Sequence, residues 1–380
     1  MDFALTDEQT QIFDIARDFA VTRMAPRAQA WEDAKALPSE VLSELGDLGM
    51  AAITVRDDFG SGLSRLDATL IFEGLSYGCP SVSAFLSIHN MVAWMIDAFG
   101  SEEQRAELLP ELATMACVAS YCLTEPGSGS DAAALRTTAR RDGDSFVLDG
   151  TKSFISGAGF SDLYLVMART GGPGAKGISA ILVDKGTPGL SFGAQERKMG
   201  WIAQPTAEVR FDACRVPAQN LLGEPGRGFA YAMQGLDGGR LSISACALGA
   251  AQATLDKSVL YLQQRSAFGQ KLADFQALQF RLADMETALQ AARIFLRQAA
   301  WKLDTKAPDA TKFCAMAKRF VTDAAFDVAN QALQLHGGYG YLADFGIEKI
   351  VRDLRVHQIL EGTNEIMRLI TARALLSQSN

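Results

Sequence analysis

Hydrophobic residues follow a helical period at both ends of the chain and a strand period in its middle. Four apolar side chains near the start fall on one helical face: Ile12, Ile15, Ala16 and Phe19. Thr6 and Gln9 precede them at the spacing of a capping box, which predicts a helix with Thr6 as its N-cap. Because helical patterns continue past a break at GMAAITVRDDFGSGLS, we expect an N-terminal helical domain over residues 1–119.

The middle of the chain is rich in turn residues. Half of the 34 glycines and six of the 11 prolines fall within residues 120–230. Between them lie short alternating or apolar runs, namely DSFVLDG, DLYLVMART, GISAILVD and AEVRFDACRV. Runs of this kind, bounded by turn residues, read as strands of an antiparallel β unit. A middle β domain over residues 120–230 is therefore predicted.

The last third of the chain returns to a helical period. Residues 270–336 contain no glycine and only Pro308, and their apolar positions keep helical spacing over many turns. We expect a C-terminal helical bundle over residues 231–380. The predicted fold class is therefore mainly α with a central β domain, in the order helical, β, helical.

Composition narrows the class of protein. With 48% hydrophobic and 21% charged residues the chain resembles an ordinary globular protein, and its net charge of −8 argues against nucleic acid or an anionic membrane as partner. Six cysteines without CxxC spacing and three histidines predict no metal site and favour reduced thiols in a cytosolic compartment. The acidic start does not resemble a signal peptide, and no apolar run approaches the ~20 residues of a membrane span.

One glycine motif resembles a dinucleotide-binding loop but lacks the required context. Gly172, Gly174 and Gly177 in GGPGAKG match the spacing of a dinucleotide-binding loop. Such a loop must open a helix, whereas the strand-like run ISAILVD follows here. We expect a hairpin loop, and the motif gives no support for NAD.

Two stretches of the β segment could meet a ligand. YCLTEPGSGSD (residues 121–131) joins Thr124, Ser128 and Ser130 to small residues whose backbone N–H groups can approach a phosphate or the edge of a flat cofactor. An ordinary polar loop between domains is the alternative. TKSFISGAG (residues 151–159) places Phe154 in a strand that ends at Gly157. This phenylalanine could flank a cofactor or simply pack in the core.

Two further stretches combine an arginine with turn residues. In LDGGR, Asp237 is a good N-cap for the long helix that follows, and Arg240 could hold a phosphate or carboxylate. The alternative is a capping turn with a surface arginine. In RSAFGQKLADFQ, Arg265 and Gln276 could bind a pyrophosphate, or the segment could merely connect two helices.

Glycines also end the glycine-free region. In QLHGGYGY, Gly337 or Gly338 can stop a helix, and two adjacent glycines hint at a ligand lying close. His336 alone reads as a structural hydrogen-bonding residue.

The segment ILEGTNEI places an acid where the pattern predicts burial. Glu361 follows Ile359 and Leu360 and precedes Gly362. A buried carboxylate is unfavourable when ionised. It therefore needs a compensating partner, or it is a base waiting for a proton.

YCLTEPGSGSD, HGGYGY and ILEGTNEI, in this order and spacing, resemble the signatures of the acyl-CoA dehydrogenase family of flavoproteins. The resemblance covers nearly the whole chain. Within the family, GLSRLDATLIFEGLSYGCPS, SIHNMVAWMIDAFG and VRDLRVHQILEGTNEIMRLI are most similar to the members that act on isobutyryl-CoA in valine breakdown. The fold this implies is an N-terminal helical domain, a β-barrel-like middle domain and a C-terminal four-helix bundle.

The resemblance also implies a binding site for FAD, to which neighbouring subunits contribute some residues. The residues matched to FAD contacts are Tyr121, Cys122, Leu123, Thr124, Gly129, Ser130, Phe154, Ile155, Ser156, Arg265, Phe268, Phe275, Gln276, Gln334, Leu335, His336, Gly337, Gly338, Thr363, Asn364 and Glu365. Those matched to acyl-CoA contacts are Ser130, Asp237, Gly238, Gly239, Arg240, Gly362 and Arg373. No metal is implied.

Glu361 matches the catalytic base of the family. The family has a second base location, and it matches Gly239, which cannot take a proton. Many members carry tryptophan where Phe154 stands, so the redox tuning of the flavin is expected to differ. Burial and the expulsion of water by substrate should raise the pKa of Glu361 toward a value suited to proton abstraction.

The implied function is FAD-dependent dehydrogenation of isobutyryl-CoA to methacrylyl-CoA, with electrons passed to an electron-transfer flavoprotein. The resemblance further implies a homotetramer built as a dimer of dimers, in a bacterial cytoplasm, or in the mitochondrial matrix if a presequence has been removed. Alternatives are 2-methylbutyryl-CoA or butyryl-CoA as substrate, an oxidase that uses oxygen, and a non-catalytic scaffold of the same fold.

Overall fold

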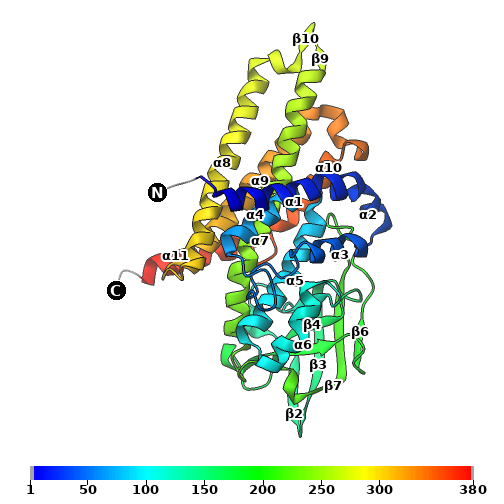
Figure 1. The fold of residues 1–380 in the computed structure, drawn as a ribbon, viewed down its shortest axis with the longest axis vertical. Coiled ribbons are helices and arrows are strands. Elements are labelled where there is room, and N and C mark those ends of the chain that lie inside the picture. Colours follow the sequence, from blue (N-terminus) through cyan, green and yellow to red (C-terminus); the bar gives the residue numbers. More distant parts are fainter. Residues whose placement is uncertain (1–3, 378–380) are drawn as a thin grey trace.

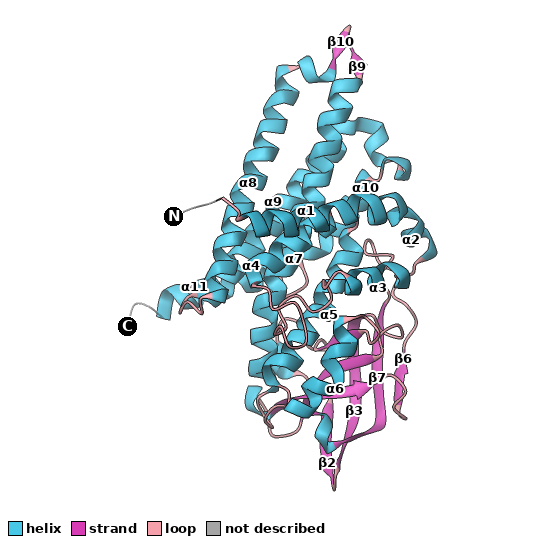
Figure 2. Cartoon of the chain, viewed as in Figure 1, coloured by secondary structure: helices cyan, strands magenta, loops and turns pink. Residues whose placement is uncertain are grey.

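The computed structural model describes residues 4–377, and helices form most of it (Figure 1, Figure 2). The N-terminal helices are α1 (Asp7–Phe19), α2 (Ala28–Ala34), α3 (Ser39–Asp47), α4 (Arg65–Ser76), α5 (Pro80–Phe99) and α6 (Glu102–Ala113). Thr6 caps α1 in a capping box with Gln9, as predicted. Ile15 departs from the predicted apolar face, because it is half-exposed.

One mixed sheet forms the middle of the chain. Its strands are β1 (Ala119–Cys122), β2 (Thr138–Asp142), β3 (Ser145–Ser156), β4 (Leu163–Arg169), β5 (Ile178–Asp184), β6 (Leu190–Phe192), β7 (Thr206–Pro217) and β8 (Leu221–Leu222). The order is β6-β7-β3-β2-β4-β5-β8, with β1 paired to β4. The expectation of a purely antiparallel unit was wrong at β4, since both β1 and the first residue of β2 pair parallel with it.

The glycine motif lies in the loop between β4 and β5, which pair antiparallel along their whole length. It opens strand β5 and no α-helix, as expected of a hairpin loop.

Three long helices dominate the C-terminal part: α7 (Gly228–Gln264), α8 (Gln276–Asp304) and α9 (Ala310–His336). A small hairpin of β9 (Ser266–Ala267) and β10 (Gln270–Lys271) joins α7 to α8 at the end of the molecule farthest from the sheet (Figure 1). The chain closes with α10 (Ile347–Arg355) and α11 (Asn364–Ser377). The helical, β, helical order is confirmed, whereas the domain boundaries at residues 119 and 230 stay predictions.

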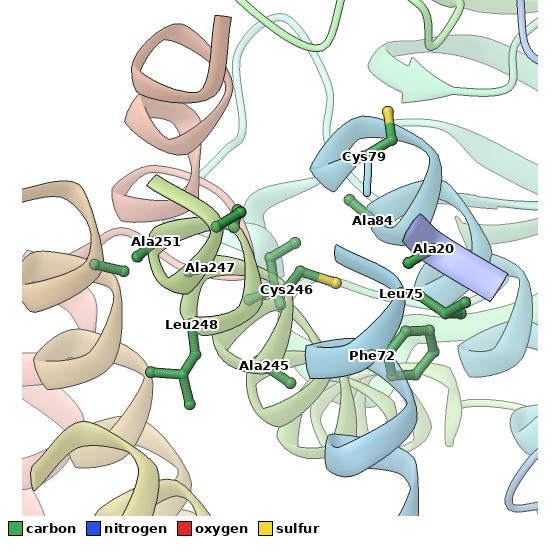
Figure 3. Close-up of a cluster of buried hydrophobic side chains, with 14 of the residues drawn as sticks. Ala20, Phe72, Leu75, Cys79, Ala84, Ala245, Cys246, Ala247, Leu248 and Ala251 are labelled. Carbon is green, nitrogen blue, oxygen red and sulfur yellow. The ribbon is translucent and has the colours of Figure 1, made fainter. Parts of the chain in front are cut away.

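The helical core depends on small side chains along α7. Ala245, Cys246 and Ala247 are completely buried in the cluster that also holds the larger Phe72 and Leu75 of α4 (Figure 3). Small residues allow two helix backbones to approach closely while large residues on one of them fill the remaining space. This packing fixes the position of α7 against α4, and α7 carries part of the site described next.

Helix α5 corrects one expectation from the sequence. It is long and apolar enough to cross a membrane by length and composition, although we predicted no such run. In the structure 72% of its apolar stretch is buried inside the protein, where it packs in the core. Serines and Asn90, which are polar, interrupt the run in the sequence and hide its length.

Candidate active site

Glu361 lies in a tight turn between α10 and α11. Its backbone adopts a left-handed φ of 56°, and Gly362 follows with φ 83°. The residue as a whole is partly covered, but its carboxylate oxygen Oε2 is buried and has no hydrogen-bond partner among the described residues. An acid that is both buried and unpartnered is the arrangement that its position in the sequence suggested.

The carboxylate of Glu361 rests directly on Gly239 of α7. A Cβ atom built at Gly239 would lie 2.6 Å from Oε2 and 3.0 Å from Cδ of Glu361. Real Cβ atoms do not come this close to another atom, so a side chain at position 239 would displace the acid. The glycine that matches the alternative base location is therefore the surface on which Glu361 lies.

Burial and two cations set the charge of Glu361. Burial raises its pKa to about 7 from an ordinary 4.5, while Arg240 and Lys318 oppose that shift. Arg240 also donates from Nε to the Glu361 backbone carbonyl at 3.3 Å. A carboxyl group with this pKa can both lose and accept a proton near neutral pH.

Asp237 has a different role from the one predicted. Helix α7 begins at Gly228, so Asp237 lies in its third turn and is not an N-cap. Its two carboxylate oxygens accept from Arg240 Nη1 and Thr311 Oγ1, each at 2.6 Å. Arg240 is also only 4% exposed, which excludes the alternative of a surface arginine. Asp237 thus orients the arginine that holds the Glu361 carbonyl.

The two β-segment stretches lie together, since the Ser153 N–H donates to Thr124 O at 2.9 Å. Lys152 is completely buried, and its Nζ donates to Leu123 O at 3.0 Å and to Glu125 Oε1 at 2.8 Å. Glu125 accepts in turn from the backbone N–H groups of Arg136 and Thr137 at 2.6 and 2.9 Å. This buried pair ties the loop after β1 to the end of β3.

Phe154 is not a core residue. It is 67% exposed, has a left-handed φ of 59° and sits where the β3–β7 register shifts. Non-glycine residues rarely hold such a conformation unless the surrounding structure enforces it. Its neighbour Ile155 and also Cys122 point into the sheet core, so only their backbones are free to meet a ligand.

Tyr121 connects this loop to Glu361. Its hydroxyl is buried without a hydrogen-bond partner among the described residues. Burial raises the pKa of Tyr121, and the charge of Glu361 raises it further, so the two side chains lie within electrostatic range. Ser130 and Gly129 stand at the outer end of the same loop, and Ser130 is exposed there.

A second group of predicted residues surrounds a hollow at the far end of α7. Arg265, Gln334, Leu335, His336, Gly337 and Gly338 line a space of about 410 Å³ together with Tyr261, Leu272, Tyr339 and Leu342. Arg265 lies over the Tyr339 ring at 5.9 Å, and His336 stacks on Tyr261 at 4.4 Å. His336 is a structural residue, since it is buried and its Nδ1 meets Ala332 O at 2.8 Å.

The β9–β10 hairpin beside this hollow exposes a second aromatic residue. Phe268 is 95% exposed with a left-handed φ of 52°, and its ring meets Phe275 edge-on at 6.3 Å. Gln276 begins α8 and is exposed. A cation, two aromatic rings and exposed glycine amides are suited to a nucleotide with its phosphates.

The two groups fit the parts of an FAD molecule but not one molecule within a single chain. Among the described residues, no neighbouring atom lies within 4 Å of the place that a Cβ would take at Gly129, Gly337 or Gly338, so a cofactor could lie against each of them. Yet Gly239 and Arg265 are separated by almost all of the remaining length of α7, which at 1.5 Å per residue is roughly 40 Å. Each group therefore suits a different part of the cofactor.

The predicted contacts on α11 differ in their availability. Asn364 is only 3% exposed and its side chain is bound to α9 through Lys318 and Asp323. Thr363 accepts from the Ile366 N–H and caps the helix, and Glu365 pairs with Arg368 at 3.3 Å. Arg373 is exposed farther along α11, and its contact with an acyl-CoA stays a prediction.

A small cavity lies behind Gly239. It has a volume of about 10 Å³, close to the smallest space that holds one water molecule. Four apolar residues contribute to its wall: Ile53, Ala68, Phe72 and Met91. Arg65 also lines it, stacked on Trp94 at 4.6 Å, and burial lowers the pKa of Arg65 to about 10.

Several site residues were not predicted from the sequence. Lys152, Lys318 and Arg65 are charged residues in elements whose pattern gave no reason to single them out. Tyr261 lies four residues before Arg265, on the same helical face, so this spacing could have revealed it. The partners of the buried lysines are distant in sequence and could not be found locally.

Comparison with known proteins covers nearly the whole chain. Models of the acyl-CoA dehydrogenase N-terminal, middle and C-terminal domains match residues 6–116, 120–214 and 226–376. The mitochondrial isobutyryl-CoA dehydrogenase of Bos taurus is 52% identical over 375 residues, which cover 98% of this chain and 90% of that protein.

Two solved structures are similar throughout. Butyryl-CoA dehydrogenase from Megasphaera elsdenii is 38% identical with a TM-score of 0.95, covering 99% of this chain and 100% of that one. PigA, solved with FAD and proline, is 30% identical with a TM-score of 0.95, covering 99% of each chain.

Proposed function

The chain belongs to the acyl-CoA dehydrogenase family, and from this premise we propose that it converts isobutyryl-CoA to methacrylyl-CoA with Glu361 as the base. It is an oxidoreductase of the FAD-dependent type. The observation that carries the proposed chemistry is the Glu361 carboxylate, which is buried on Gly239 with an unpartnered oxygen among the described residues and a pKa of about 7.

Glu361 takes a proton from Cα of the acyl group. The α-proton of a thioester is a weak acid, so a carboxylate in bulk water would be too weak a base to remove it. A carboxylate without water or a hydrogen-bond partner on Oε2 is a stronger base, because its charge is poorly stabilised before the proton arrives. Bound FAD supplies the acceptor for the hydride that leaves Cβ.

Arg240 and the turn at Gly362 keep the base in place. Arg240 holds the Glu361 carbonyl, and Asp237 holds Arg240 while Thr311 donates to Asp237. By resemblance to the family, the N–H of Glu361 donates to the thioester oxygen and stabilises the charge that develops there. A left-handed turn fixes the direction of this N–H together with that of the carboxylate.

The small cavity behind Gly239 argues against a long acyl group. Phe72 and Met91 close it from α4 and α5, and it has room for little more than one water molecule. A long acyl chain would have to displace these side chains, which are almost fully buried. Butyryl-CoA or 2-methylbutyryl-CoA is the second candidate substrate, favoured by the likeness to butyryl-CoA dehydrogenase.

The partners follow from the family and from the division of the cofactor site. We propose a homotetramer in which one subunit offers the loops around Tyr121 and Phe154, and its neighbour offers the hollow beside Arg265. An electron-transfer flavoprotein is the proposed electron acceptor. A bacterial cytoplasm, or the mitochondrial matrix for a processed chain, is the proposed compartment.

Anaerobic mixing of the purified protein with a panel of acyl-CoA thioesters tests this function. We expect isobutyryl-CoA to bleach the flavin absorbance faster than butyryl-CoA or 2-methylbutyryl-CoA. Glu361→Gln should keep the yellow colour and acyl-CoA binding but bleach about 10²- to 10⁴-fold more slowly, since a general base contributes this much. Glu107→Gln, on the exposed face of α6, is the matched control.

A purified protein without colour would contradict the proposed FAD-dependent function and favour a non-catalytic scaffold of the same fold. Bleaching by Glu361→Gln at the wild-type rate would contradict the assignment of the base. A panel in which butyryl-CoA reacts fastest would select the second candidate substrate.

A further inference from the structure

A lysine of α9 lies directly beneath the turn that carries Glu361. Lys318 is completely buried, and its Nζ donates to the Gly362 carbonyl at 2.8 Å and to Asn364 Oδ1 at 2.9 Å. These two acceptors flank Thr363, so a single ammonium group holds both the end of the turn and the first residue of α11.

The turn needs such an anchor because its backbone is strained. Glu361 holds a left-handed φ of 56°, which a residue with a side chain adopts at a cost of about 1–3 kcal/mol. Arg240 binds the carbonyl of Glu361 and Lys318 binds the carbonyl of the next residue, Gly362. The two cations thus hold successive peptide groups from two different helices, α7 and α9.

Charge as well as geometry links Lys318 to the base. Burial lowers the pKa of Lys318 to about 7, and Glu361 opposes this shift. The other charged groups that face Lys318 are Arg240 on α7, Asp323 on α9 and Glu365 on α11. Lys318 in turn helps to lower the pKa of His357, which lies between α10 and the turn.

A helix cap alone does not require this residue. Taking an ammonium group out of water is unfavourable, and a neutral donor could satisfy either acceptor. A buried cation adds something that a neutral donor lacks, namely a positive charge close to Glu361. That charge favours the carboxylate over the carboxylic acid.

We propose that Lys318 is a positioning residue for the base: it fixes the turn that lays Glu361 on Gly239 and keeps the acid ionised and ready to accept a proton. This inference rests on the proposed function in that it takes Glu361 as the base. It goes further in assigning the readiness of that base to a residue that does not touch the substrate.

The test isolates proton abstraction from hydride transfer. An acyl-CoA analogue with sulfur in place of Cβ can lose an α-proton but has no hydride to give. Exchange of its α-protons with deuterated solvent, followed by NMR across a pH series in the flavin-loaded protein, therefore reports the base alone. Thermal unfolding of each variant reports the fold.

Lys318→Met should slow this exchange of the order of 100-fold, the loss expected when a reacting group shifts by about 1 Å. It should also move the acid limb of the pH profile upward by about one unit, because Glu361 loses a neighbouring cation that favours its charged form. Lys318→Arg should return the acid limb toward the wild-type position. Lys349→Met, which removes another buried lysine from a pair with Asp353, controls for lost stability.

An acid limb that stays in place in Lys318→Met, with a loss of thermal stability like that of Lys349→Met, would overturn the proposal and leave a structural cap. A wild-type protein that exchanges no α-protons would overturn the base and the role of Lys318 together. The exchange profiles test the role of Lys318 even if isobutyryl-CoA leaves the flavin unbleached. Unbleached flavin would contradict only the proposed substrate.

Discussion

At the scale of the residue, the base depends on a neighbour that has no side chain. The carboxylate of Glu361 occupies the space in which a Cβ of residue 239 would stand. Two consecutive glycines in α7 are unfavourable for a helix, each by about 1 kcal/mol relative to alanine. We infer that the helix retains Gly239 because the acid needs its place.

Gly239→Ala tests this dependence. The new methyl group would lie 2.6 Å from Oε2, so the carboxylate must move. We expect flavin reduction by acyl-CoA to fall roughly 100-fold, because small misplacements of reacting groups are costly in rate. Thermal stability should change little, since the gain in helix propensity offsets the crowding.

Gly235→Ala, one turn earlier in α7, is the control for this change. Its Cβ would meet the Met95 sulfur at 2.8 Å, and that flexible side chain can yield. Near wild-type reduction is expected for Gly235→Ala. Equal losses of rate in both variants would show that a general disturbance of α7, and not contact with Glu361, explains the effect.

The raised pKa of Glu361 should also be visible in stability. Between its ordinary value of 4.5 and about 7, the folded protein binds a proton that the unfolded chain has released. The free energy of unfolding therefore falls as pH rises through this window, by up to about 3 kcal/mol from this group. Glu361→Gln removes the titration, so its stability should exceed that of wild type increasingly up to pH 7 and then level off.

Denaturant unfolding of both proteins across this pH range measures the difference. A constant gap between the two stability curves would mean that the carboxyl group titrates normally, and it would contradict the raised pKa. The expected trend means that the buried, reactive carboxylate lowers the stability of the folded protein.

The sequence predicts those site residues whose role shows in the local pattern, and it misses what depends on contacts with distant elements. Glu361, Phe154 and Arg265 could be singled out from local patterns. The sequence predicted the burial of Glu361 but not its cause, since Ile359 is 50% exposed and the acid is covered by α7, more than a hundred residues away. Lys318 occupies an unremarkable helical position, and only the fold brings it to Gly362.

At the scale of the element, the loop after β1 and the end of β3 act as one unit. Lys152 binds Leu123 and Glu125, and Ser153 N–H donates to Thr124 O at 2.9 Å. Phe154 follows immediately with its left-handed backbone. The buried ion pair therefore holds both stretches that are expected to flank the flavin.

Lys152→Met should break this unit. It leaves Glu125 buried without its cation, and losing one partner of such a pair destabilises a protein by about 3–5 kcal/mol. Burial alone would raise the pKa of Glu125, but Lys152 holds it below its ordinary value, so the unpaired acid should take up a proton more readily. Isothermal titration of the flavin-free protein with FAD should show weaker binding.

Lys185→Met serves as the control for Lys152→Met. Lys185 is an exposed lysine of the same sheet region that donates to Phe160 O at 3.1 Å. Substitutions at exposed positions of this kind usually change stability by less than about 0.5 kcal/mol. If Lys152→Met retained wild-type stability and FAD affinity, the ion pair would have no role in shaping the loop.

Elements were more predictable than their ends and their pairing. Strong periodicity predicted α1, the three long C-terminal helices and the four longest strands, β3, β4, β5 and β7. The start of α7 was placed ten residues too late, because Asp237 resembles an N-cap although its carboxylate accepts from Arg240 inside the helix. The parallel pairing of β1 was missed because a four-residue strand carries no signal of its partner.

At the scale of the whole molecule, α7 separates two surfaces that suit two parts of FAD. Glu361 lies on Gly239 in the first half of the helix and Tyr121 is within electrostatic range of Glu361, whereas the hollow around Arg265 lies at the C-terminal end of the helix. The separation of roughly 40 Å follows from helix geometry alone. This separation supports the proposal that two copies of the chain complete the cofactor site, each with a different part of its surface.

Complementation between two inactive variants tests this division. In a mixed oligomer, some sites take Glu361 from an Arg265→Ala chain and the hollow from a Glu361→Gln chain. Such a site is intact, because neither substitution falls in the part that its chain supplies. With random mixing in a symmetric assembly, about a quarter of the sites should combine the two intact parts. We expect co-expressed chains to recover about that share of the wild-type rate of flavin reduction, although each variant alone is impaired. If Arg265 instead served the FAD of its own chain, every site would keep one defect and mixing would restore nothing.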